Sequence, residues 1–356
     1  QKGDKNYKSA TRDVSHLLAK LKKEKVDSVL IDLRNNGGGS LDEAIELTGL
    51  FIEKGPVVQQ RDARGSVKVE SDTNGAPVWD GPLGVLINRS SASASEIFAA
   101  AIQDYGRGLV IGEPSFGKGT VQTIINLDEV AHNDKPKFGD LKMTVAQFFR
   151  INGGTTQLRG VTPDIGFPTS ADAEEYGESS FDNALPWVKI DAADYKPEGD
   201  LSTLLPLLQT RHDIRVKTDK DFQYLQEDIA EFTAKRKKHM ISLNEAERRK
   251  ERDAQEARIK SREKNSDAGK NANGKQAANK GATTAKNKAL QEDDGLQANE
   301  RNLSVELAAE KAAKEAKDVL LGEAAHILGD EVGLLKADTR LAARVLPTSA
   351  LLPNQK

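Results

Sequence analysis

Hydrophobic and polar positions follow two different patterns in the first 170 residues. Short apolar runs predict buried strands, whereas apolar residues spaced three or four apart predict helices. The runs predicted as strands are 29–31, 82–88, 109–111, 121–127 and 143–151. The stretches predicted as helices are 13–22, 41–52 and 92–104. Because strands and helices follow one another at short spacing, the sequence predicts a mixed α/β fold with layered sheets and helices.

The pattern changes after about residue 170. Residues 201–264 have helical spacing and are highly charged, and residues 260–289 contain no Val, Ile, Leu, Met, Phe, Trp or Tyr. A stretch without these residues cannot bury a core, so we expect it to be disordered. A last helix is predicted from near Ser304. The predicted segments are a core (1–170), the first part of a helical C-terminal domain (171–259), a disordered polar linker (260–300) and a C-terminal helical segment (301–356).

Composition narrows the classes of function. The chain has 356 residues with 52 Lys and Arg against 55 Asp and Glu, which argues against nucleic-acid binding by the whole chain. The absence of cysteine excludes disulfides, thiolate nucleophiles, thiolate zinc sites and iron–sulfur clusters. None of the five histidines lies three or four residues from another, and no apolar run is long enough to span a membrane. We therefore expect no metal and no cofactor, and Gln1 as first residue suggests a processed or truncated product.

Two segments follow predicted strands and offer backbone N–H groups. Gly37, Gly38 and Gly39 allow a close approach of the backbone to a ligand, although a flexible turn is the favoured interpretation when they are taken alone. Ser93 stands at a predicted helix start, where the helix dipole favours a developing oxyanion. Ser93 with Glu96 also fits the S-x-x-E capping box, so an ordinary cap is the competing interpretation.

The segment 112–120, GEPSFGKGT, nearly matches the phosphate-binding pattern G-x-x-x-x-G-K-[ST]. Gly119 occupies the position of the required hydroxyl, and the β-branched residues that follow predict a strand rather than the helix that phosphate binding needs. Nucleotide binding is therefore disfavoured. Lys118 is instead a candidate general base for a serine, which requires a lowered pKa, and Gln122 is placed to hold its amine.

Four stretches together resemble the carboxy-terminal processing peptidase family, of the tail-specific protease type. They are IDLRNNGGGSLDEA (31–44), INRSSASASEIFAAAIQDYGRGLVIGEPSFGKGTVQ (87–122), GVTPDI (160–165) and FDNALPW (181–187). The resemblance implies a layered core of the ClpP/crotonase-like type. It also implies Ser93 as nucleophile, Lys118 as base, Gln122 as the residue that orients the lysine, and the backbone N–H groups of Gly39 and Ala94 as oxyanion hole.

The resemblance further implies a serine endopeptidase of the periplasm that cleaves proteins with exposed apolar C-terminal tails. Members usually carry a PDZ domain before the core, so we expect this chain to be a fragment that lacks it. An adaptor protein is expected to dock on the helical C-terminal region. The alternative is a noncatalytic core fragment that acts as a protein-interaction or adaptor module, because the charged helices after residue 200 offer a docking surface.

Overall fold

The computed structural model describes residues 8–135, 137–170, 175–270 and 317–351. The chain divides into two compact units, one from Gln1–Phe232 together with Asp318–Lys356 and the other from Thr233–Lys317. The first unit contains both sheets and every residue of the candidate site. We describe the two units separately.

A parallel sheet forms the centre of the first unit, in the strand order β1-β4-β5-β8. Val29 pairs with Leu83 and Gly84 with Leu109 in its register. All five residues of β4 are buried, as expected for a parallel strand that is covered on both faces. The strands are β1 (Val29–Asp32), β4 (Leu83–Ile87), β5 (Leu109–Gly112) and β8 (Ile165–Gly166). This sheet with its flanking helices confirms the predicted α/β class.

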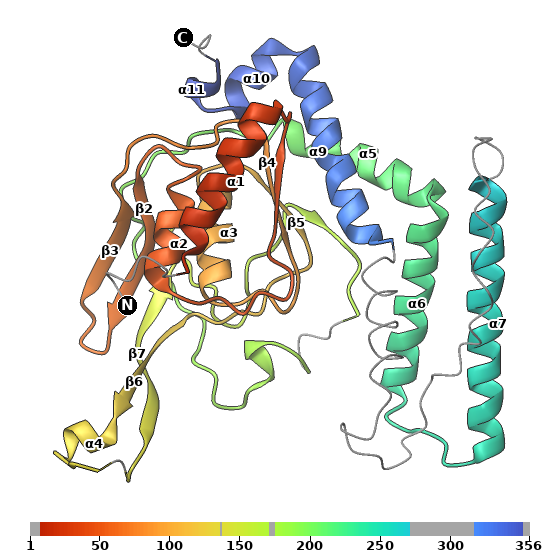
Figure 1. Cartoon of the computed structure of the whole chain (residues 1–356), viewed down its shortest axis with the longest axis horizontal. Helices are drawn as coiled ribbons and strands as arrows, with labels where there is room; N and C mark the ends of the chain where they lie inside the picture. The colour runs from red at the N-terminus through yellow and green to blue at the C-terminus, as the bar shows by residue number, and fades with distance from the viewer. Residues whose placement is uncertain (1–7, 136, 171–174, 271–316, 352–356) are drawn as a thin grey trace. The chain divides into compact units, whose positions relative to one another are not determined.

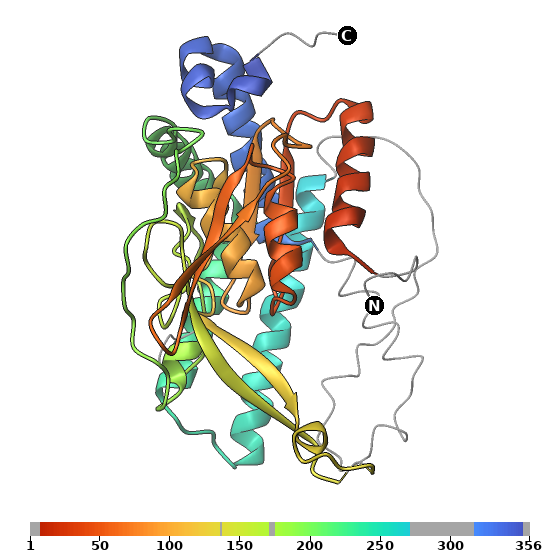
Figure 2. The same cartoon turned by 90° about the vertical axis from the view of Figure 1, so that its left-hand side faces the viewer.

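A second, antiparallel sheet has the order β3-β2-β7-β6. Its strands are β2 (Gly55–Asp62), β3 (Val67–Asp72), β6 (Thr120–Asn126) and β7 (Asp140–Phe149). Strands β6 and β7 extend from the core as a long hairpin with α4 (Leu127–Val130) near its end (Figures 1 and 2). The Asp128 carboxylate accepts the backbone N–H groups of Lys137, Phe138 and Gly139, which holds the end of the hairpin together.

Three helices cover one face of the parallel sheet: α1 (Ala10–Glu24), α2 (Leu41–Thr48) and α3 (Ala94–Asp104). Helix α1 begins at Ser9, whose hydroxyl oxygen accepts the backbone N–H of Arg12 at 3.1 Å. The rings of Phe51 and Phe98 meet edge to face in the core beneath these helices, with centroids 5.7 Å apart. The sequence predicts each of these helices to within a few residues.

The opposite face of the parallel sheet is covered by helices from much later in the chain. These are α5 (Leu204–Thr218), α9 (Val319–Ala337) and α10 (Thr339–Val345). Leu86 and Ile111 point to this side and share a hydrophobic cluster with Leu208 and Ile327. These three helices therefore complete the core of the first unit.

The other elements are η1 (Glu178–Ser180), α6 (Lys220–Lys237), α7 (Glu245–Lys270) and α11 (Thr348–Leu351). Helix α7 continues through residues 260–270, so the prediction that these residues belong to a disordered linker is wrong. The many Ala, Arg, Glu and Lys residues of α7 favour a helix, and Arg249 forms an ion pair with Glu245 one turn away. The remainder of that linker and the predicted helix start at Ser304 lie outside the described residues. Among the described helices, none combines the length and the apolar character needed to cross a membrane.

Candidate active site

Ser93 ends the tight turn that links β4 to α3, residues 88–93, which we name the Ser93 elbow. Its φ of 57° and ψ of −113° lie outside the extended region that a capping serine adopts. A side chain at such a φ is strained, and this strain is a recurrent feature of functional sites. Ser93 is partly exposed, whereas Ser91 and Ser95 are buried and donate to the carbonyls of Leu33 and Asn36. Among these three serines, only Ser93 combines exposure with a strained backbone.

Residues 34–39, the glycine loop, lie directly against the Ser93 elbow. The Ala92 N–H donates to the Asn36 carbonyl at 3.0 Å. Gly38 has a φ of +91°, and a Cβ at this position would lie 2.7 Å from the backbone nitrogen of Ala94 and 3.0 Å from the Cβ of Ser93. Glycine is therefore required at position 38, because any side chain would push the loop away from the serine.

Two backbone N–H groups at this contact are candidates for an oxyanion hole. The N–H of Gly38 donates to Asn36 Oδ1 at 3.0 Å and is occupied. Within the described ranges, no backbone hydrogen bond engages the N–H of Gly39 or of Ala94. These two N–H groups would bind the oxyanion of a substrate, and their assignment as the oxyanion hole stays a prediction.

Glu96 joins the Ser93 elbow to the loop that carries Lys118, residues 113–119, which we name the lysine loop. Its side chain is completely buried. Oε2 accepts the backbone N–H groups of Ser93 at 2.7 Å and Lys118 at 3.0 Å. Oε1 accepts the hydroxyl of Ser115 at 2.6 Å and the N–H of Gly117 at 2.7 Å. One carboxylate thus fixes the two segments with respect to each other.

Burial raises the pKa of Glu96 to about 7, and the hydrogen bonds from Ser115, Gly117, Ser93 and Lys118 act in the opposite direction. The carboxyl therefore titrates close to neutral pH in a position that controls the geometry of both loops.

The Lys118 amine is partly buried and donates to the Thr120 carbonyl at 3.0 Å. Burial lowers its pKa, which is the direction a general base needs. In the described part of the chain, no hydrogen bond joins this amine to the Ser93 hydroxyl or to Gln122, which is exposed on β6. The structure brings the backbones of Ser93 and Lys118 together through Glu96, and the roles predicted for Lys118 and Gln122 stay predictions.

The local structure of the lysine loop differs from that of a phosphate-binding P-loop. The loop leads into β6 at Thr120, so no helix N-terminus is present to hold a phosphate. Among the described residues, no group of three or more His, Asp or Glu side chains is arranged to hold a metal ion.

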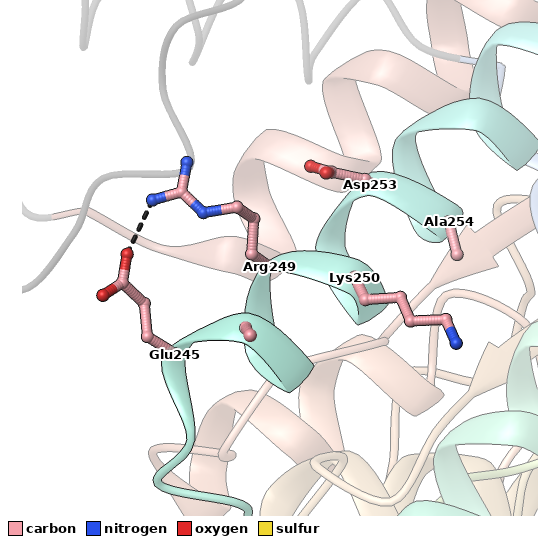
Figure 3. Close-up of a pocket in the computed structure, with 6 residues that line it drawn as sticks. Glu245, Arg249, Lys250, Asp253 and Ala254 are labelled. Carbon is pink, nitrogen blue, oxygen red and sulfur yellow. Dashed lines mark hydrogen bonds and ion pairs between the residues drawn. The ribbon is translucent and has the colours of Figure 1, made fainter.

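Two of the hollows in the described part of the chain are spacious, and both lie away from the candidate site. One, of about 800 Å³, runs along the start of α7 and is lined by that helix alone (Figure 3). In it Arg249 donates to Glu245 at 2.7 Å. The other, of about 750 Å³, is lined by residues that include Asp72, Tyr105 and Glu198. Neither hollow is lined by a residue of the Ser93 elbow or the lysine loop, so we assign the hollows no role in the chemistry of the candidate site.

Comparison with known proteins decides the family. Residues 4–167 match the model of peptidase family S41, and residues 171–333 match the C-terminal domain of tail specific protease (DUF3340). The chain belongs to peptidase family S41. The S41 match contains Ser93, Lys118 and Gln122, and it agrees with the resemblance seen in the sequence.

Relatives of this S41 chain are longer than it is. The tail-specific protease of Haemophilus influenzae is 46% identical over 255 residues, which cover 71% of this chain and 37% of that protein. The carboxy-terminal-processing protease of Bartonella bacilliformis is 39% identical over 163 residues, which cover 46% of this chain and 36% of the relative. The solved photosystem II D1 C-terminal processing protease has a TM-score of 0.40 and 32% identity, covering 44% of this chain and 39% of that one.

Four residues of this S41 site were not singled out as functional by the sequence. Glu96 was interpreted only as a helix cap, although a glutamate inside the apolar stretch of α3 was a signal of a buried carboxylate. Gly38 could not be separated from its two glycine neighbours. Gln157 and Glu178, which contact the lysine loop, carry no pattern that a sequence alone reveals.

Proposed function

We propose that the chain is the catalytic part of a serine peptidase that processes proteins at their carboxyl ends, with Ser93 as nucleophile and Lys118 as general base. The observation that carries this proposal is the position of Ser93. It is strained and partly exposed at the start of α3, and Glu96 Oε2 ties its backbone to that of Lys118. The names of the relatives, tail-specific and carboxy-terminal-processing proteases, support the same activity.

The proposed reaction uses no cofactor. The amine of Lys118 turns from the Thr120 carbonyl toward Ser93 and takes the hydroxyl proton as the oxygen attacks the peptide carbonyl. The N–H groups of Gly39 and Ala94 stabilise the oxyanion. The Lys118 ammonium then gives its proton to the leaving amine, and water hydrolyses the acyl-enzyme with the same lysine as base.

The pKa of Lys118 determines how this reaction depends on pH. Only the neutral amine is a base, and burial lowers the pKa of Lys118 below its ordinary value of 10.5. The fraction of neutral amine therefore rises with pH and reaches its limit below the pH at which a solvated lysine would. Acylation should follow this rise, with Gln122 helping to orient the amine as the family resemblance implies.

The substrates, partners and location belong to the same proposal. We propose that the substrates are partly unfolded proteins with apolar C-terminal tails, which bind as extended strands read mainly through their backbone. An adaptor protein that docks on the helical C-terminal region and a periplasmic location complete the proposal. The charged helices after residue 200 support the docking, and the family resemblance supports the location.

A fluorophosphonate probe tests the assignment of the nucleophile and the base. The unmodified chain should be labelled at Ser93, with a rate that rises with pH, whereas Ser93→Ala and Lys118→Ala should lose labelling while unfolding at a similar denaturant concentration. Ser90→Ala is the matched control, because Ser90 is also partly exposed and lies in the same run of serines. Unchanged labelling of Ser93→Ala would refute the proposal, and absent labelling of the unmodified chain would favour the noncatalytic module instead.

Cleavage of an unfolded protein tests the substrate class. We expect a substrate with an apolar tail to be cut at least about tenfold faster than the same protein with a charged tail. Equal cleavage rates for the two substrates would contradict the preference for apolar tails but would leave the assignment of Ser93 as nucleophile unchanged.

A further inference from the structure

Residues 176–181, which we name the covering segment, lie against the lysine loop. The Glu178 N–H donates to the Phe116 carbonyl at 3.0 Å. The rings of Tyr176 and Phe116 meet edge to face with centroids 6.0 Å apart. The covering segment falls within the residues that match the C-terminal domain of tail specific protease, whereas the lysine loop falls within the S41 match.

Arg89 of the Ser93 elbow strengthens this contact. Its Nε donates to the Tyr176 carbonyl at 2.9 Å, and its Nη1 donates to the Ser115 carbonyl at 2.7 Å. Arg89 is 7% exposed, so these charge-assisted bonds form in a largely dry environment where they are strong. The covering segment, the lysine loop and the Ser93 elbow are therefore held to one another.

A chain of two hydrogen bonds then leads from the covering segment to the backbone beside the lysine. Gln157 Nε2 donates to Glu178 Oε1 at 3.0 Å, and Gln157 Oε1 accepts the N–H of Gly119 at 2.8 Å. Gln157 is completely buried, and a buried amide whose two ends are both bonded is fixed in orientation. Its position thereby determines where the Glu178 carboxylate lies with respect to Lys118.

We propose that Gln157 and Glu178 are positioning residues of the peptidase, which clamp the lysine loop and hold a carboxylate where its charge acts on the Lys118 amine. This inference rests on the proposed role of Lys118 as base. According to this inference, the covering segment controls how readily Lys118 accepts and releases a proton.

Three charged groups act on the Lys118 amine from the elements around it. The carboxylates of Glu178 in η1 and Glu96 in α3 favour the charged amine, and Lys142 in β7 disfavours it. Burial is the largest influence and lowers the pKa of Lys118, and Glu178 is the strongest of the three charges. Glu178 thus limits how far the pKa of Lys118 falls, so that the neutral amine remains basic enough to accept the serine proton.

The substitution Glu178→Gln separates charge from geometry. The new amide keeps an oxygen that accepts from Gln157, but it removes the negative charge. The pKa of Lys118 should then fall further, because the charge of Glu178 that favours the protonated amine is removed. The rise of acylation with pH should move to lower pH by the same amount.

Two readouts measure this shift on the full chain. The first is the pH dependence of Ser93 labelling by a fluorophosphonate. The second is the pH dependence of Lys118 acetylation by trace acetic anhydride, followed by peptide mass spectrometry, which needs no peptidase activity. Glu175→Gln is the matched control, since Glu175 belongs to the same part of the chain and does not appear among the charges that act on Lys118.

We expect both curves to move to lower pH in Glu178→Gln, to stay in place in Glu175→Gln, and to return toward the original position in Glu178→Asp. The proposed role of Glu178 would be refuted if the acetylation curve of Glu178→Gln coincided with that of the original chain or moved to higher pH. If the original chain is not labelled at Ser93, the peptidase proposal fails, and the acetylation curves alone still decide whether Glu178 acts on the amine.

Discussion

The contact between the glycine loop and the Ser93 elbow leads to a specific prediction for Gly38→Ala. The added methyl group would lie 2.6 Å from the carbonyl oxygen of Ala92 and 2.7 Å from the nitrogen of Ala94, closer than any real side-chain carbon approaches. It would also place a side chain at a φ of +91°. The substitution therefore perturbs the contact between the two loops beside Ser93, the proposed nucleophile.

The size of the effect depends on which side of the contact yields. An unfavourable backbone angle costs about 1–3 kcal/mol, and overpacking adds about 1–3 kcal/mol if nothing moves. The elbow continues into the buried helix α3, whereas all three glycines of the loop are exposed, so the loop should retreat and relieve most of the overpacking. Retreat by about 1 Å would displace the N–H of Gly39 from the oxyanion position, and a loss of this kind lowers the rate about 100-fold or more.

The assay compares acylation of Ser93 with unfolding by denaturant. Gly38→Ala should be acylated about 100-fold more slowly while its free energy of unfolding falls by only about 1–3 kcal/mol. Gly37→Ala is the matched control, because a Cβ there meets no atom within 4 Å and its φ is not positive, and it should behave like the original chain. Equal acylation rates for the two variants would refute the assignment of the glycine loop to the oxyanion hole.

Two further predictions concern buried carboxyl groups. Glu96→Gln turns an amide N–H₂ toward two of the four donors that the Glu96 carboxylate now accepts. We therefore expect the free energy of unfolding to fall by about 1–3 kcal/mol and acylation of Ser93 to slow at least about tenfold. Acylation at the original rate would show that the carboxylate is dispensable. Glu331 in α9 is 1% exposed, and burial raises its pKa from 4.5 to about 8 against the opposing charge of Arg107. The folded chain therefore holds a proton that the unfolded chain releases, and the free energy of unfolding should fall by on the order of 5 kcal/mol as pH rises across this interval. Urea unfolding at several pH values should show this loss in the original chain and not in Glu331→Gln, and parallel curves for the two would contradict it.

The residues proposed to carry the chemistry were accessible from the sequence because each lies in a short local pattern. Ser93 lies between an apolar strand and a helix, and Lys118 lies among glycines before a β-branched strand. These surroundings made both residues candidates, and the family resemblance then implied their roles. The same holds for α1, β4 and α3, whose apolar spacing is strong enough to be independent of context. The strands β2 and β3 were not predicted, since their mixed polar composition hides the period of two.

The connections among these residues were not accessible. The sequence shows Glu96 three residues after Ser93 and therefore suggests a cap, but its hydrogen bonds to Ser115, Gly117 and Lys118 exist only because β5 lies beside β4 in the sheet. Gln157 and Glu178 reach the lysine loop from still further along the chain. Pairings of this kind depend on how elements pack, and packing is not encoded in any one local window.

The sequence by itself therefore determined the class of fold, the local elements and the identity of the nucleophile and base candidates, because periodicity and short motifs are local properties. Tertiary structure alone decided that helices α5 and α9 close the core on the far face of the parallel sheet, that Gly38 is the glycine pressed against the serine, and that one buried carboxylate joins two loops. The physical reason is that close contact and burial arise between segments that are distant in the chain, and the sequence of one segment does not indicate which other segment it packs against.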